Sequence, residues 1–253
     1  MSGPLAGKVV LVTGGGAGLG RAICVDAARH GASVVIASPG RNGADTATLV
    51  NEVGVGCHVP TDVTVLADVG QAVTVAVEKF GRLDAIVHNA TSRLSSEVET
   101  IDELTDEAWD DHVAVSLTGA YHCAVAGFAA LRDTGGRYVL MTSPAGIEGS
   151  ANRPAYSAVK GAVRSMVKSL ALEWGAAGIT VVGVSPLAMT PAMANAYDAD
   201  PALKDRLAKL VPLGRVGDAA TDVAPVVRFL LEDDSRYITG QTIIVDGGRF
   251  TTL

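Results

Sequence analysis

Short apolar runs alternate along the chain with longer segments in which apolar residues recur every three or four positions. The runs Val9–Val12 and Val34–Ile36 are continuously apolar and mostly β-branched, which is typical of strands covered on both faces of a sheet. By contrast, the segment Gly18–His30 places Leu19 and Ile23 on one face of a helix. This alternation predicts a parallel sheet with helices on both faces.

The same patterns give the expected order of elements. We expect strands at residues 8–13, 33–37, 57–59, 83–88, 137–142, 180–184 and 242–245. Helices are expected at residues 18–30, 44–53, 66–80, 107–131, 155–175, 201–210 and 220–231. Neither an internal repeat nor a Pro/Ser-rich linker interrupts the 253 residues. The prediction is therefore one α/β domain over residues 1–253.

Composition narrows the class of protein. With 48% hydrophobic and 19% charged residues, the chain is expected to fold rather than to be disordered. The net charge is −7 and no basic block occurs, so a nucleic-acid partner is not expected. Three scattered cysteines, with no CxxC pair, favour free thiols in a reducing compartment and no metal site. No signal-peptide pattern is present, and we expect a cytoplasmic protein.

One uncharged stretch, residues 113–131, is long enough to span a bilayer. It also contains Ser116, Tyr121, His122 and two glycines. A buried helix of a soluble fold fits this mixture better than a membrane span does.

A glycine-rich segment joins the first expected strand to the first expected helix. It reads Gly14-Gly15-Gly16-Ala17-Gly18-Leu19-Gly20. Glycines there allow a tight turn and close backbone approach, and the following helix N-terminus attracts a phosphate group. The alternative is a plain glycine-rich turn, but its place in an alternating chain favours a pyrophosphate site.

The second expected strand ends near Ser38. Dinucleotide-binding folds often place an acid here for the ribose diol of NAD, whereas enzymes that use NADP place a base nearby. Neither Ser38 nor Pro39 is acidic, and Arg41 follows. Arg41 is thus a candidate partner of a 2′-phosphate, or else a solvated loop arginine. NADP is favoured and NAD remains open.

Tyr156 and Lys160 are four residues apart and share one face of an expected helix. A nearby cation lowers the pKa of a phenol, which makes it a usable acid and base. Ser143 follows an expected strand, where a hydroxyl can bond to a substrate oxygen. The plain alternatives are a surface Tyr/Lys pair and a turn serine before Pro144.

Taken in order, these motifs resemble the short-chain dehydrogenase/reductase family. The resemblance rests on the glycine loop, Thr61-Asp62-Val63, Asn89-Ala90, Ser143, Tyr156-x-x-x-Lys160 and the tail Tyr237-Ile238-Thr239-Gly240…Val245-Asp246-Gly247-Gly248. It covers nearly the whole chain. It implies a Rossmann-like, doubly wound sheet of six or seven strands, and a homodimer or homotetramer with helix 113–131 at an interface.

The resemblance also implies roles for single residues. Tyr156 would be the general acid/base, Lys160 would bind the nicotinamide ribose and lower the tyrosine pKa, and Ser143 would polarise the carbonyl. The glycine loop would hold the pyrophosphate, Asp62 with Val63 would lie at the adenine, and Asn89 with Ala90 would line the groove. Pro186 and Thr190 lie where the family contacts the nicotinamide carboxamide.

Three positions depart from the family pattern. Thr91 stands where glycine is usual, Leu187 follows Pro186 where glycine is usual, and Ser116 stands at a catalytic position usually held by asparagine. A serine has one donor where an amide has two, so we expect a water relay to Lys160 to be weakened rather than abolished.

The function that these residues predict is reversible hydride transfer between a nicotinamide and a small carbonyl or secondary alcohol. The alternative is a protein that binds the cofactor with little turnover and acts as a sensor or scaffold. Residues 191–212 are expected to form a lid, and Ile147, Glu148, Asn152 and Arg153 are expected to line the other wall of the substrate pocket. Sugar, steroid, acyl thioester, quinone and small ketone substrates all remain open.

Overall fold

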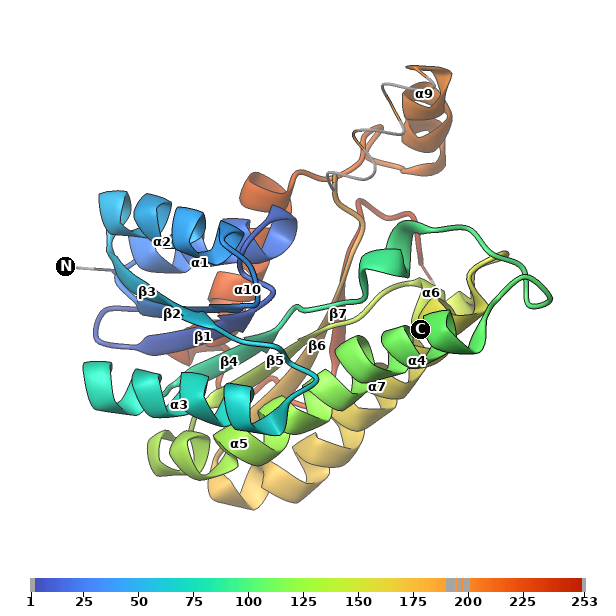
Figure 1. Cartoon of the computed structure of the whole chain (residues 1–253). Helices are drawn as coiled ribbons and strands as arrows, with labels where there is room; N and C mark the ends of the chain where they lie inside the picture. Colours follow the sequence, from blue (N-terminus) through green and yellow to red (C-terminus); the bar gives the residue numbers. More distant parts are fainter. Residues whose placement is uncertain (1–2, 190–193, 195–196, 198–200, 252–253) are drawn as a thin grey trace.

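The computed structural model describes residues 3–189, 194, 197 and 201–251. Seven parallel strands form one sheet in the order β3-β2-β1-β4-β5-β6-β7 (Figure 1). The strands are β1 (Val9–Thr13), β2 (Ser33–Ser38), β3 (Val55–Pro60), β4 (Ala85–His88), β5 (Arg137–Met141), β6 (Thr180–Pro186) and β7 (Thr242–Val245). All seven predicted strands are present, so the predicted doubly wound parallel sheet is confirmed.

Helices cover both faces of this sheet. One face carries α1 (Gly18–Arg29), α2 (Asn42–Val53) and α10 (Ala224–Leu231); the other carries α3 (Leu66–Phe80), α5 (Gly119–Thr134) and α7 (Pro154–Trp174) (Figure 1). The remaining helices are α4 (Asp106–His112), α6 (Ala145–Glu148) and α9 (Pro201–Leu210). Right-handed crossovers between parallel strands require this two-sided cover.

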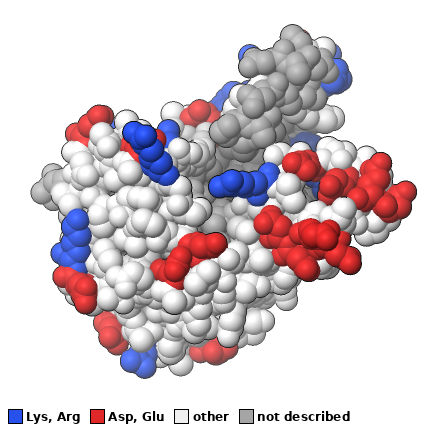
Figure 2. Space-filling view, viewed as in Figure 1, with Lys and Arg blue, Asp and Glu red and all other residues white. Residues whose placement is uncertain are grey.

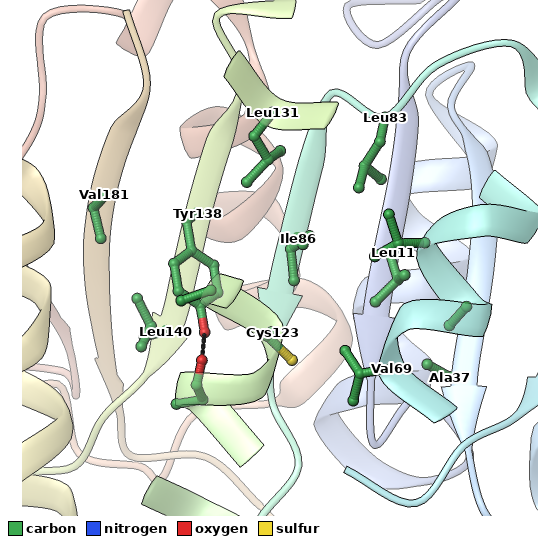
Figure 3. Close-up of a cluster of buried hydrophobic side chains, with 14 of the residues drawn as sticks. Leu11, Ala37, Val69, Leu83, Ile86, Cys123, Leu131, Tyr138, Leu140 and Val181 are labelled. Atoms are coloured by element: carbon green, nitrogen blue, oxygen red, sulfur yellow. Dashed lines mark hydrogen bonds between the residues drawn. The ribbon is translucent and has the colours of Figure 1, made fainter. Parts of the chain in front are cut away.

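Strand alternation divides the core into two clusters. In β1, Val9 and Leu11 pack with the α3, α5 and α7 layer, whereas Val10 and Val12 pack with the α1 and α10 layer. On the first side the fully buried Tyr138 donates a hydrogen bond to the carbonyl of Ala120, with 2.7 Å between the oxygens (Figure 3). The α5 helix is therefore fixed to β5 at its N-terminal end.

The long helix expected at 107–131 is three consecutive pieces. Between α4 and α5 the backbone forms a π-helix, η2 (Val113–Thr118). A widened turn of this kind is frequent at functional sites, and here it contains the buried Ser116. The expected helix at 220–231 likewise starts with a π-helical turn, η4 (Ala219–Val223), whose first amides are capped by Asp218.

The strand order reverses at β1, which pairs with β2 on one side and with β4 on the other. The loops that leave the carboxyl ends of these strands diverge, and ligands of such sheets bind in the crevice between them. Of the predicted lid, residues 201–212 are described and contain α9, which stands away from the sheet layers (Figure 1). Residues 191–193, 195–196 and 198–200 of that lid lie outside the described residues.

Candidate active site

The glycine loop turns sharply between β1 and α1. Gly14 and Gly18 have positive φ angles of 63° and 50°, which other residues rarely adopt. A Cβ on Gly20 would lie 2.2 Å from the Gly14 carbonyl oxygen, so no larger residue fits there. Ala17 precedes α1 without a side chain that could cap it, and the first amides of the helix are left for an anion. The loop therefore fits a pyrophosphate group.

Asn89 holds this loop from the neighbouring strand. Its amide nitrogen Nδ2 donates to the carbonyls of Thr13 (3.3 Å) and Gly14 (3.2 Å). The backbone amides of Asn89 and Ala90 both donate to the Thr13 hydroxyl, at 3.1 and 3.2 Å. The structure thus brings Asn89 and Ala90 against the glycine loop, at the carboxyl ends of β1 and β4.

The opposite side of the crevice carries the residues predicted to bind the adenosine half. Ser38 is buried at the end of β2, and Arg41 is exposed directly before α2. Asp62 is exposed just beyond β3, where its Oδ1 accepts hydrogen bonds from the amide and hydroxyl of Thr64. Val63 is buried beside Gly119. No carboxylate occurs between residues 38 and 44.

Ser143, Tyr156 and Lys160 come together at the carboxyl end of β5. Ser143 follows the strand by two residues. Its Oγ accepts a hydrogen bond from the amide of Ala145 at 3.2 Å, and its hydroxyl lowers the pKa of Tyr156. The buried Lys160 donates from Nζ to the Met141 carbonyl at 2.9 Å and lies 5.7 Å from the centre of the Tyr156 ring. The structure therefore brings together Ser143, Tyr156 and Lys160, the three residues that the sequence indicated as candidate catalytic residues.

The electrostatics of Tyr156 differ from the expectation. Burial raises the pKa of Tyr156, while the hydrogen bond from Ser143 and the charge of Arg153 lower it. The lowering expected from Lys160 is not among the effects on this pKa, and burial outweighs the lowering by Ser143 and Arg153. Burial also lowers the pKa of Lys160 to about 8. Arg153 is a second cation over the Tyr156 ring, 5.4 Å from the ring centre, beside Lys160 at 5.7 Å.

Ser116 occupies a fully enclosed position in η2. Its carbonyl bonds with Nε2 of His88 at 3.2 Å, and its hydroxyl lies 3.2 Å from that of Thr91. His88 also contacts the Thr13 hydroxyl through Nδ1 at 3.1 Å. Burial, together with the charge of Lys160, lowers the pKa of His88 to about 3, which keeps the ring neutral.

The structure describes only part of the region that is expected to contact the nicotinamide. Pro186 is the last residue of β6, and the amide of Leu187 donates to Val245 in β7. Thr190 lies outside the described residues. Leu187 lines a cavity of about 430 Å³ together with Arg215, Asp222, Asp246 and Phe250. Within the described part of the chain, no group of His, Cys, Asp or Glu side chains is arranged to hold a metal ion.

The sequence did not indicate His112 as a site residue, and it indicated Arg153 only as part of the pocket wall. His112, at the end of α4, packs edge-on against Tyr156 with 6.4 Å between ring centres. Arg153 was expected in the pocket wall, but not over the Tyr156 ring. The contact of Arg153 with Tyr156 is local, since the two residues are three positions apart at the start of α7. The contact of His112 depends on how α4 packs against α7, and no spacing in the chain signals it.

Comparison with known proteins identifies the family. The family described as enoyl-(acyl carrier protein) reductase matches residues 14–249. The L-rhamnose-1-dehydrogenase of Scheffersomyces stipitis is 33% identical, with all of both chains covered. The 3-oxoacyl-[acyl-carrier-protein] reductase of Staphylococcus epidermidis is 32% identical over 96% of this chain and 99% of its own.

Comparison with a solved structure supports the same family. An NAD+-bound xylitol dehydrogenase superposes with a TM-score of 0.90 at 28% identity, covering 96% of this chain and 99% of its own. The fold and site define a nicotinamide-dependent oxidoreductase. The chain belongs to the short-chain dehydrogenase/reductase family.

Proposed function

We propose that this enzyme interconverts a ketone or aldehyde and the corresponding alcohol, with Tyr156 as the general acid/base. The observation that carries the proposal is the placement of one half-buried phenol beside three partners. The Ser143 hydroxyl acts on the phenol, and Lys160 and Arg153 both lie over its ring, 5.7 and 5.4 Å from the ring centre. The Ser143 hydroxyl and the charge of Arg153 act toward the phenolate form that alcohol oxidation requires, against the effect of burial.

In oxidation, Tyr156 takes the hydroxyl proton of the alcohol while the carbon–hydrogen bond breaks and its electron pair leaves as hydride. When bound, the nicotinamide supplies or takes up that hydride. Ser143 donates a hydrogen bond to the same substrate oxygen and keeps it within reach of Tyr156. Lys160, fixed by the Met141 carbonyl, is placed to hold the ribose and to return protons to Tyr156.

For the cofactor we propose NADP(H), held by the glycine loop at the pyrophosphate and by Arg41 at the 2′-phosphate. Two observations support this choice. Residues 38–44 have no carboxylate to repel a phosphate, and Arg41 is exposed at the start of α2. The solved xylitol dehydrogenase binds NAD+, so NAD(H) is the competing choice.

The experiment combines binding with turnover. Purified protein is titrated with NADPH and NADH by fluorescence and by thermal shift, since a ligand that binds the native state raises the melting temperature. A carbonyl and alcohol panel is then assayed with wild type, Tyr156→Phe and Arg41→Ala. We expect Tyr156→Phe to bind cofactor normally and to lose about 10²–10⁴-fold in turnover.

The alternatives give different results. Cofactor binding without turnover across the panel would favour a sensor or scaffold over an enzyme of this reaction. Equal binding of NADPH by wild type and Arg41→Ala would remove Arg41 from the 2′-phosphate site. Binding of neither nucleotide would overturn the proposal as a whole.

We also propose that the apolar outer face of α5 is covered by a second copy of the chain. The continuous helix Asp106–Thr134 is long and apolar enough to cross a membrane, and 33% of its most apolar window is buried. Tyr121 and Val125 remain exposed on α5, as does Leu172 on α7. Light scattering without detergent should show a dimer or tetramer; a monodisperse monomer would contradict the proposal.

A further inference from the structure

A second small cleft lies beside the catalytic tyrosine, away from the cofactor crevice. It runs between the end of α4, the loop after β4 and the start of α7. Its walls include Glu97, Glu99, Leu104, His112, Arg153 and Tyr156. Because Tyr156 belongs to its wall, a substrate held at the phenol can extend into this cleft.

The ring of His112 forms part of the cleft wall. The residue is only 4% exposed, and its Nδ1 is buried and has no hydrogen-bond partner among the described residues. Burial lowers the pKa of His112, although Asp111, Glu99 and Glu97 act in the opposite direction. The ring is therefore neutral near pH 7, with one nitrogen that donates and one that accepts. Such a ring suits a hydroxyl group, which also does both.

The loops at the mouth of the cleft are tied together. The amide of Glu99 donates to the Asn152 carbonyl at 2.8 Å, and Arg153 donates to the Ser95 carbonyl at 3.3 Å. Asn152 has a φ of 59° and is the one non-glycine residue with positive φ in the described part of the chain. Strain of this kind persists where the surroundings enforce it, often at ligand sites. Here the turn at Asn152 ties the loop that carries Glu99 to the residue before Arg153.

The cleft wall carries two carboxylates, Glu97 and Glu99, and one cation, Arg153, and the surrounding loop adds further acidic residues. Between residues 94 and 112 the chain has eight carboxylates and no lysine or arginine. Acidic side chains gather over this part of the surface in Figure 2. Glu97 and Glu99 accept hydrogen bonds from hydroxyl groups and repel a phosphate-bearing carrier.

We propose that this cleft is a substrate subsite which binds a hydroxyl group on a carbon next to the reacting carbon, so that the substrate is an uncharged, hydroxyl-rich alcohol or its carbonyl counterpart. The proposal rests on the proposed function, because it assigns the substrate of the same site. It disfavours acyl groups carried on coenzyme A or on an acidic carrier protein, both of which are polyanionic.

The experiment compares matched alcohols in the oxidation direction with the preferred cofactor. The substrates are cyclohexanol, cis- and trans-cyclohexane-1,2-diol, and 3-hydroxybutyryl-coenzyme A. For wild type we expect kcat/KM to be about tenfold or more higher for the better diol than for cyclohexanol, since a site built for a hydroxyl discriminates strongly against its absence. The coenzyme A thioester should be the poorest substrate.

Variants separate recognition from general damage. In His112→Phe the ratio of diol to cyclohexanol should fall to about one, and in His112→Gln part of it should return, because an amide both donates and accepts. Trp109→Phe, on the same helix but outside the cleft wall, should keep the wild-type ratio. If His112 variants do not fold, Glu97→Gln/Glu99→Gln provides the second test, because these side chains lie at the rim. This variant should lower the diol preference and raise the relative rate with the thioester.

The outcomes distinguish the two proposals. Equal kcat/KM for diol and cyclohexanol in wild type, or an unchanged ratio in both His112→Phe and the Glu97/Glu99 variant, overturns the subsite and leaves the proposed function intact. A cofactor-bound protein that oxidises no alcohol of the panel overturns the proposed function, and the subsite with it.

Discussion

The hydroxyl groups of Thr91 and Ser116 lie 3.2 Å apart, which joins two positions where this chain departs from its family. Thr91 follows the end of β4, and Ser116 lies in the π-helix that precedes α5. A threonine in place of glycine adds bulk on one side, and a serine in place of asparagine removes it on the other. The two side chains therefore share one space in the site, and we expect a change at one position to affect the other.

This contact predicts strong coupling between the two positions. Ser116→Asn alone should destabilise the fold, because Ser116 is only 1% exposed and Thr91 fills the adjacent space. Thr91→Gly/Ser116→Asn should recover the stability and exceed wild type in turnover, because the amide restores a second donor for the relay to Lys160. The coupling free energy from denaturation should reach about 1 kcal/mol or more. Additive effects, or unchanged turnover in the double variant, would argue that the pair has no role in the relay.

We expect removal of the Arg153 charge to change the dependence of kcat/KM on pH. Its charge lowers the pKa of Tyr156, so Arg153→Ala should raise that pKa. Alcohol oxidation needs the phenolate, and the rising limb of kcat/KM against pH should therefore move to higher pH. Arg29→Ala, at the exposed end of α1, is the matched loss of one positive charge and should leave the profile in place. Equal shifts in both variants would mean that only net charge matters.

His88 predicts acid sensitivity of the fold. Its pKa falls from 6.5 in the unfolded chain to about 3 in the folded protein, so the unfolded state binds the proton first. The stability that this group contributes is complete above pH 6.5 and is lost as the pH falls toward 3, with a slope approaching about 1.4 kcal/mol per pH unit. His88→Gln should remove this part of the slope in urea unfolding at pH 7, 6 and 5. His30→Gln, a half-buried histidine at the end of α1, should retain it.

We expect loss of the Tyr138 hydroxyl to affect the stability of the fold and not the activity. Its hydroxyl is fully buried and its ring stacks on Trp174, with 5.9 Å between ring centres. Tyr138→Phe keeps the ring and removes the bond to Ala120, and the free energy of unfolding should fall by about 1 kcal/mol. Tyr237→Phe, at a 99% exposed position, should change nothing measurable. A loss of activity in Tyr138→Phe without a loss of stability would contradict this assignment.

The sequence predicted the sheet because its strands are buried on both faces and carry no polar alternation. The bounds of α3 at Leu66–Phe80 and of β7 at Thr242–Val245 agree with the expectation. The π-helix was not predictable, since the same residues satisfy the apolar pattern of an α-helix. In the folded protein η2 packs against α7, and this tertiary contact accompanies the wider turn.

The sequence spacing was enough to predict which residues form the catalytic group. Tyr156 and Lys160 share a helix face whatever surrounds them, and Ser143 must lie at the end of its strand. The direction of the Tyr156 pKa was wrong because it depends on burial, which a motif does not carry. His112 reaches the site from a helix 44 residues earlier in the chain, and nothing in its neighbourhood marks it as a partner of Tyr156.

The strand order also sets the sequence of events on the ribosome. The strands β1, β2 and β3 are neighbours in space and are complete once residue 60 has been made, whereas Tyr156 follows almost a hundred residues later. At about 5–20 residues per second, the nucleotide half is available for roughly 5–20 seconds before the catalytic helix exists. During translation, the growing chain therefore has its phosphate loop well before it has any means of catalysis.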